Sequence, residues 1–80
     1  MTVKVRLYAT LRRYMPSVEL GKSVEIQVPD GATVGVLLDV LSIPRDEMRT
    51  CYVAGLYRGI EHPLQEGDDV ALFPPIGGGA

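Results

Sequence analysis

The stretch SVEIQVPDGATVGVLLDVL, residues 23–41, changes its hydrophobic period at its centre. In its first half Val24, Ile26 and Val28 alternate with polar residues, which is the period of two of a half-buried strand. Pro29-Asp30-Gly31 then supplies residues that favour a turn. This half of the stretch therefore predicts a strand that ends in a tight turn.

The second half of the stretch has the period of a helix. Its apolar residues recur at intervals of three and four, and they are Val34, Leu37, Leu38 and Leu41. Thr33 is placed to cap this helix, which we expect to reach about Ser42. Because glycine inside a helix costs about 1 kcal/mol relative to alanine, we also expect a neighbouring feature that favours or tolerates a small residue at Gly35.

An earlier run of residues has the period of a strand as well. Val3, Val5 and Leu7 alternate with polar residues, and this run would pair with the strand of residues 23–28 as a hairpin. The connection between the two runs is longer than a tight turn. Within it, residues 11–14 predict one helical turn that ends before Pro16.

Short elements follow the main helix. Ile43-Pro44 interrupts the helical pattern, and residues 44–48 predict a second helical turn with Pro44 at its first position. The remaining predictions, in chain order, are a short strand at 51–53 closed by Gly55, a short strand or extended loop at 56–60, a turn-rich connection at 62–69, and a final strand at 70–73.

This order of elements predicts the fold. A hairpin followed by a helix that crosses to later strands of the same sheet gives a mixed sheet with one covered face. We therefore expect an α+β, ubiquitin-like β-grasp fold with a mixed sheet of four to five strands and one main helix packed on one face. The expected core comprises Val3, Val5, Leu7, Val24, Ile26, Val28, Val34, Leu37, Leu38, Leu41, Val53, Leu64, Val70 and Leu72.

Composition excludes several classes of protein. The chain has 80 residues, of which 46% are hydrophobic and 22% charged, as expected for one globular domain. The net charge is −2 and basic residues are scattered, which argues against a nucleic-acid partner. A single cysteine cannot form an internal disulfide, and no apolar run is long enough for a membrane helix. We expect a cytoplasmic protein without a membrane partner.

The end of the chain, Phe73-Pro74-Pro75-Ile76-Gly77-Gly78-Gly79-Ala80, contributes little to a core. Proline restricts its own backbone and that of the preceding residue, whereas consecutive glycines have the largest backbone freedom. The expected division is thus a β-grasp domain over 1–75 and a flexible tail over 76–80. Aromatic residues on the exposed side of a sheet are enriched at interfaces, so Tyr8 and Phe73 are candidate partner contacts.

Other residues with chemically versatile side chains have structural explanations. Cys51 is interpreted as a packed hydrophobic residue of a strand, although a transfer thiol is the alternative. His62 is interpreted as a loop residue, because no second ligand stands at metal spacing. Asp68-Asp69 favours a turn over a metal site, and Arg12-Arg13 favours a solvated patch over a partner contact.

The chain resembles the ubiquitin-like sulfur carriers of the MoaD/ThiS family over nearly its whole length. The residues that carry the resemblance are the β-grasp order, the run from His62 to Pro75 with its Pro63-Leu64, Gly67-Asp68 and Phe73-Pro74-Pro75, and the terminal glycines. The Phe-Pro-Pro form is more similar to the small subunit of molybdopterin synthase than to the carrier of the thiamine pathway.

The resemblance implies chemistry at the terminus and no catalytic side chain. An E1-like enzyme would use ATP to adenylate the terminal glycine, and a sulfur donor would convert it to a thiocarboxylate. The tail, from Phe73 through Pro74, Pro75, Ile76 and Gly77 to Gly78 and Gly79, would then deliver sulfur to the molybdopterin precursor in the active site of the synthase large subunit. The carrier itself would bind no cofactor.

The final residue departs from the family's terminal Gly-Gly. We expect Ala80 to be removed by a peptidase, which would expose Gly79 as the sulfur-carrying residue. The alternatives are a carrier for thiamine or another sulfur-containing metabolite, a ubiquitin-like modifier joined to lysines, and a plain β-grasp binding domain. The sequence does not name the final acceptor, the activating enzyme or the oligomeric state.

Overall fold

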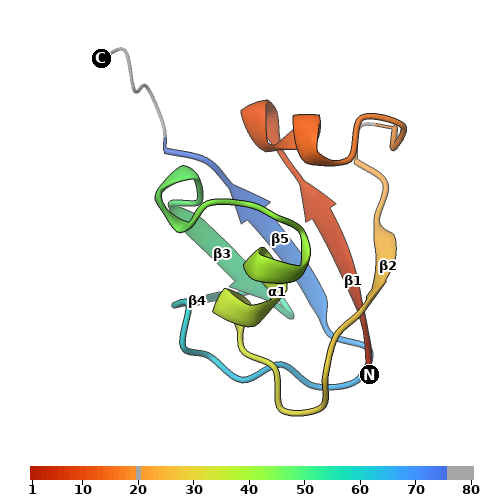
Figure 1. Cartoon of the computed structure of the whole chain (residues 1–80), viewed down its shortest axis with the longest axis vertical. Coiled ribbons are helices and arrows are strands. Elements are labelled where there is room, and N and C mark those ends of the chain that lie inside the picture. Colours follow the sequence, from red (N-terminus) through yellow and green to blue (C-terminus); the bar gives the residue numbers. More distant parts are fainter. Residues whose placement is uncertain (20, 76–80) are drawn as a thin grey trace.

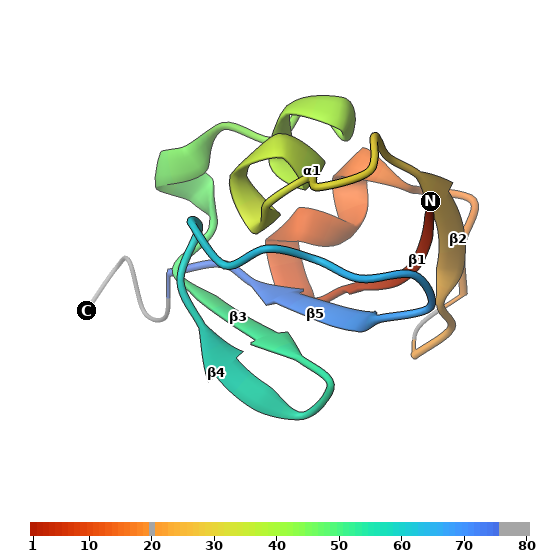
Figure 2. The same cartoon turned by 90° about the horizontal axis from the view of Figure 1, so that it is seen from below.

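A mixed sheet with helices on one side forms the structure (Figures 1 and 2). The computed structural model describes residues 1–19 and 21–75, and in them five strands lie in the order β2-β1-β5-β3-β4. The strands are β1 (Thr2–Leu7), β2 (Val24–Gln27), β3 (Thr50–Val53), β4 (Leu56–Arg58) and β5 (Asp69–Phe73). The helices are α1 (Val34–Val40) and the 3₁₀ helices η1 (Ala9–Tyr14) and η2 (Arg45–Glu47). The β-grasp prediction is confirmed.

The strand register explains why one face of the sheet is apolar. β1 pairs antiparallel with β2, with Val3 opposite Ile26, which confirms the predicted hairpin. β1 also pairs parallel with β5, with Val5 opposite Val70, and β5 pairs antiparallel with β3. Because side chains alternate between faces, this register places the apolar residues of the three central strands on the side that α1 covers.

Local hydrogen bonds define both ends of α1. The Thr33 Oγ1 accepts a hydrogen bond from the backbone N–H of Val36 at 3.3 Å, as predicted for a cap. At the other end, the N–H of Ser42 donates to the carbonyl of Asp39 and the N–H of Ile43 donates to that of Leu38. This is the Schellman arrangement, with Ser42 at a φ of 60°. The helix therefore ends at Val40, shorter than the prediction of about Ser42.

A close approach of two segments explains the small residue at Gly35. Its backbone N–H donates to the carbonyl of Ile60 at 2.8 Å. A Cβ on Gly35 would lie 3.0 Å from the Arg45 guanidinium and 3.4 Å from the Ile60 carbonyl oxygen. Glycine thus leaves room for both the segment before His62 and the η2 side chain.

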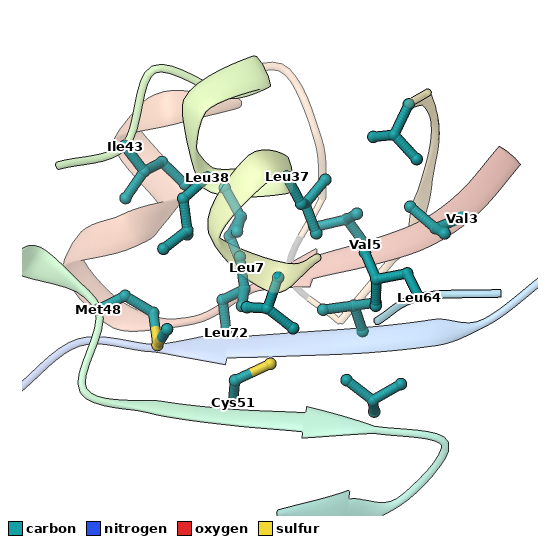
Figure 3. Packing of buried hydrophobic residues seen from close by; sticks show 14 of the residues in the cluster. Val3, Val5, Leu7, Leu37, Leu38, Ile43, Met48, Cys51, Leu64 and Leu72 are labelled. Atoms are coloured by element: carbon teal, nitrogen blue, oxygen red, sulfur yellow. The ribbon is translucent and has the colours of Figure 1, made fainter. Parts of the chain in front are cut away.

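The core lies between α1 and the sheet (Figure 3). Leu37 and Leu38 of α1 are fully buried, as are Val3 and Val5 of β1 and Leu72 of β5. Val24, Ile26 and Leu41 are only partly buried, because β2 has a neighbouring strand on one side alone and Leu41 lies beyond the helix end. Buried residues absent from the expected core list are Leu11, Ala32, Ile43, Met48 and Cys51.

The structure assigns the segment after the Ala54-Gly55 turn, which the sequence left open, and the start of η2. Ala54 and Gly55 have φ values of 53° and 81°, which gives the two-residue hairpin turn that joins β3 to β4. Residues 56–58 of the uncertain segment are thus a strand. Pro44 precedes η2 as its cap, so its predicted place at the first helical position is wrong by one residue. None of the helices described over 1–19 and 21–75 is long and apolar enough to cross a membrane.

Candidate partner interface at the root of the tail

One face of the sheet is left open by the helices of residues 1–19 and 21–75, which all lie on the other side (Figure 2). Alternating residues of the central strands, Lys4 and Arg6 of β1 and Ala71 of β5, lie on this open face because their neighbours are buried in the core. A shallow hollow of about 110 Å³ lies over Ala71, with Arg6 and Tyr52 among its lining residues. A partner could place a side chain there.

Aromatic rings extend across the same face. The rings of Tyr8 and Phe73 are stacked, with 4.5 Å between centroids and 7° between planes. Tyr52 meets Phe73 edge to face at 5.9 Å and meets Tyr57 at 6.1 Å. We call Tyr8, Phe73, Tyr52 and Tyr57 the aromatic patch. The structure therefore brings together the two predicted contact residues, Tyr8 and Phe73, while their contact with a partner stays a prediction.

One end of the aromatic patch, the stack of Tyr8 on Phe73, lies at the point where the chain leaves the sheet. The carbonyl of Phe73 accepts a hydrogen bond from the Arg49 N–H at 2.9 Å, and the carbonyl of Leu72 accepts one from the Tyr8 N–H at 3.1 Å. Pro74 and Pro75 follow directly. The backbone is thus held by hydrogen bonds up to Phe73. The predicted tail residues Ile76, Gly77, Gly78, Gly79 and Ala80 lie outside the described residues.

The sequence missed half of the aromatic patch. Tyr52 and Tyr57 are 40% and 67% exposed, and they are paired across β3 and β4. The signal in the sequence was a tyrosine on either side of the Ala54-Gly55 turn, at positions that a two-residue hairpin places opposite each other. The sequence leaves residues 56–60 as either a short strand or an extended loop, so it does not place the two tyrosines opposite each other.

Cys51 and the acidic pair have the structural roles expected of them. Cys51 is 1% exposed, and burial raises the pKa of its thiol to about 11, so the reactive thiolate is disfavoured at neutral pH. The Asp68 Oδ2 accepts a hydrogen bond from the Gln65 N–H at 2.8 Å, as in a turn. His62 lies in a loop, and its carbonyl accepts a hydrogen bond from the Val34 N–H. The part of the chain that the structure describes has no cluster of metal-ligating residues.

The two arginines of η1 are both exposed, as expected of a solvated patch, but Arg13 also makes contacts within the protein. Arg13 forms an ion pair with Glu47 of η2 and donates a hydrogen bond to the Tyr14 hydroxyl, which itself donates to Glu47 at 2.9 Å. The hydrogen bond to Tyr14 is the largest effect and raises the pKa of Arg13; desolvation lowers it, and the charge of Glu47 raises it further. Arg13 thus links η1 to η2 although it is exposed, as Arg12 is.

Solved structures share this fold over the full length of the chain. SAMP1 from Haloferax volcanii is 25% identical, with a TM-score of 0.73 and coverage of 98% of this chain and 99% of that one. A putative molybdopterin converting factor, subunit 1, from Pyrococcus furiosus is also 25% identical, with a TM-score of 0.72 and coverage of 95% and 99%. The HVO 2177 protein of H. volcanii is 29% identical, with a TM-score of 0.72 and coverage of 98% and 86%.

The sequence comparisons define the family. No curated protein matches the sequence. Residues 1–77 match the family model described as Mut7-C ubiquitin, which covers the sheet, all the helices and the root of the tail. The chain therefore belongs to the Mut7-C ubiquitin family and is a small ubiquitin-like protein of the MoaD/ThiS type.

Proposed function

We propose that this protein is a non-catalytic sulfur carrier of molybdenum- or tungsten-cofactor synthesis. The observation that carries the proposal is the course of β5. This strand lies between β1 and β3 in the sheet and runs through Phe73 into Pro74-Pro75, after which the sequence continues with three glycines. A terminus that starts from a hydrogen-bonded central strand is suited to presentation inside a partner's active site.

The proposed chemistry takes place on the terminal carboxylate. An E1-like enzyme joins the carboxylate to the AMP part of ATP and releases pyrophosphate. A persulfide sulfur then attacks the acyl carbon and AMP leaves. Cleavage of the resulting acyl disulfide by a thiol gives the thiocarboxylate, and the thiol takes up the other sulfur as a disulfide. Glycine suits this role because it has no Cβ to obstruct the approach to its carbonyl carbon.

The chain's own residues supply reach and orientation in this scheme. Residues 76–79 can span at most roughly 14 Å at about 3.3–3.6 Å each. The hydrogen bonds at Leu72 and Phe73 fix the start of that span, while Tyr8 and Phe73 offer a contact surface beside it. The proposed recipient is a molybdopterin synthase large subunit, and the likeness to the P. furiosus protein called subunit 1 of a molybdopterin converting factor supports this choice.

Mass spectrometry tests the proposal. A chain that ends at Gly79 is incubated with an activating enzyme, ATP and a persulfide donor, and its C-terminal peptide should gain the mass difference between sulfur and oxygen. Deletion of Gly78 and Gly79 from this chain should abolish the gain, and omission of ATP should do the same for the chain that ends at Gly79. A terminus that stays unmodified with activating enzymes of both the molybdopterin and the thiamine pathway would refute the proposal.

Removal of Ala80 is part of the proposal. The intact mass of the protein purified from its native cell should correspond to a chain that ends at Gly79. A chain that still carries Ala80 and is nevertheless converted to a thiocarboxylate would contradict this step alone.

A second candidate function is protein modification. The likeness to SAMP1 favours it, because a related crystal structure is described as small archaeal modifier protein 1. In this case the activated glycine would be joined to lysines of other proteins. Isopeptide-linked remnants of the tail on cellular proteins would support modification, and their absence from cells that accumulate the thiocarboxylate would favour sulfur transfer alone.

A further inference from the structure

β4 forms an outer edge of the sheet and is exposed on both of its faces. The strand order places β3 on one side of it and no described strand on the other. Leu56 is 56% exposed and Tyr57 is 67% exposed, although both are large apolar or aromatic side chains. The opposite edge, β2, instead presents exposed Glu25 and Gln27. Charged and polar side chains discourage strand addition at an edge, so β4 is the less protected edge.

The hairpin turn determines which way the backbone of β4 points. A two-residue turn at Ala54-Gly55 makes Val53 and Leu56 the pair that exchanges hydrogen bonds. The next pair, Tyr52 and Tyr57, is then a non-hydrogen-bonded pair. The backbone N–H and C=O of Tyr57 consequently point away from β3, toward the outer edge. They are available to an added strand.

A hollow of about 260 Å³ lies beside this edge. It is bounded on one side by Leu56 and Arg58 of β4 and on the other by His62 and Pro63. Arg58 is exposed and forms no ion pair within residues 1–19 and 21–75. The hollow also includes Asp68, but one oxygen of that carboxylate already accepts the Gln65 N–H. The unpaired cation of the hollow is therefore Arg58.

We propose that the β4 edge binds an extended peptide segment of a partner protein, with apolar residues and one acidic side chain. The segment adds a strand beside β4 through the backbone of Tyr57. Its apolar side chains cover Leu56 and Tyr57, and its carboxylate lies in the hollow opposite Arg58. Strand addition of this kind obtains affinity from backbone hydrogen bonds and specificity from alternate side chains.

The area that a partner would bury at the β4 edge and the charge of Arg58 favour a peptide segment over a second copy of this chain. A second copy paired through three-residue edge strands would bury little beyond Leu56 and Tyr57, far below the roughly 1,200 Å² of a stable interface. Two copies would also bring two Arg58 side chains near each other, and β4 itself has no acidic side chain to pair with them. The edge is separate from the tail root, since the register places Tyr57 opposite Tyr52 and Thr50 opposite Phe73. The binding therefore does not depend on an activated C-terminus.

Amide chemical shifts of the full-length protein test the proposal. The probe is a capped pentapeptide with a central glutamate between pairs of valines, and the control probe has lysine in place of the glutamate. We expect saturable shifts at residues 56–59 and at His62. The lysine peptide should bind about fivefold more weakly, which is the upper range for an exposed ion pair.

Variants separate the backbone contact from the side-chain contacts. Tyr57→Pro removes the outward N–H and leaves the β3–β4 hydrogen bonds intact. The glutamate peptide should therefore bind the Tyr57→Pro variant at least about fivefold more weakly than it binds the Tyr57→Ala variant. Arg58→Glu should reverse the preference between the two peptides. Leu56→Ala should weaken binding, because the peptide's apolar side chains cover Leu56. Its matched control is Val40→Ala, which trims a residue that is 47% exposed on α1 and should not change binding.

Three outcomes would overturn the proposal. They are the absence of saturable binding, equal affinity for the two peptides, and shifts at Tyr8 and Phe73 without shifts in β4. If the Tyr57→Pro variant does not fold, the reversal of peptide preference expected for Arg58→Glu tests the proposal in its place. None of these results depends on conversion of the terminus to a thiocarboxylate, so they are distinguishable from failure of the sulfur-carrier proposal.

Discussion

The stack of Tyr8 on Phe73 should contribute measurably to stability, although both residues are only partly buried. Their ring centroids lie 4.5 Å apart with nearly parallel planes. Aromatic pairs contribute about 0.5–1.5 kcal/mol beyond the area that they bury. A double-mutant cycle with Tyr8→Ala and Phe73→Ala should therefore give a coupling free energy of about 1 kcal/mol.

The Phe73→Ala variant should lose more than this coupling. Phe73 also meets Tyr52 edge to face and is half-buried, so we expect a total loss of about 2 kcal/mol in the free energy of unfolding. For a domain of this size such a loss lowers Tm by about 8–16 °C. Urea unfolding followed by circular dichroism measures the free energy, and thermal unfolding followed by the same signal measures Tm.

The matched control is the pair Tyr52 and Tyr57, whose rings meet edge to face at 6.1 Å on the more exposed β3–β4 hairpin. Its coupling should be smaller than that of Tyr8 and Phe73. A Tyr8–Phe73 coupling below about 0.3 kcal/mol, which is the range of additive sites, would refute the reasoning. If the stack also contributes to docking, Phe73→Leu should raise KM for the activating enzyme more than it lowers kcat.

The remaining predictions concern the core, the helix cap and the cysteine. Leu37→Ala should lower the free energy of unfolding by about 2–5 kcal/mol, because Leu37 is fully buried on the face of α1 that packs on the sheet; a loss below about 1 kcal/mol in urea unfolding would contradict this packing. Thr33→Ala should cost about 1 kcal/mol and Thr33→Ser much less, since serine keeps the hydroxyl that caps Val36; equal losses would argue against the cap. Cys51 should resist iodoacetamide at pH 8 in the native protein and react in urea, because its pKa is raised to about 11 and it is buried. The stabilising contribution of the buried Cys51 thiol is fully present below pH 9. It declines as the pH rises from about 9 to 11, because the thiol ionises in the unfolded chain at a lower pH than in the folded protein. Rapid alkylation of the folded protein would disprove the packing role.

Much of the fold could be predicted because the relevant signals are local. The alternation of Val3, Val5 and Leu7 identifies β1, and the three-and-four spacing from Val34 identifies α1. Thr33 was recognised as a cap from its place before that spacing. The Schellman end of α1 was missed because it uses Ser42 in a left-handed conformation, which glycine or asparagine would ordinarily signal.

The candidate site was only half predictable. Tyr8 and Phe73 stood out next to predicted strands, but Tyr52 and Tyr57 required the assignment of β4. That strand has only three residues, Leu-Tyr-Arg, and all are exposed. It is too short to show the alternation of apolar and polar residues that identifies a half-buried strand in a sequence. The link from Arg13 to Glu47 joins residues 34 positions apart, and no local pattern indicates such a pair.

The sequence by itself determined the kinds and order of the main elements, the cap at Thr33 and the place of the glycine run, which follows the last strand after Pro74, Pro75 and Ile76. These follow from hydrophobic period and turn chemistry, which depend on residues close in the chain. Only the tertiary structure decided that Tyr8 and Phe73 stack, that Gly35 makes room for Ile60 and Arg45, and that β4 presents an open edge beside Arg58. The physical reason is that these features depend on sheet order and on contacts between distant segments, which local periodicity does not specify.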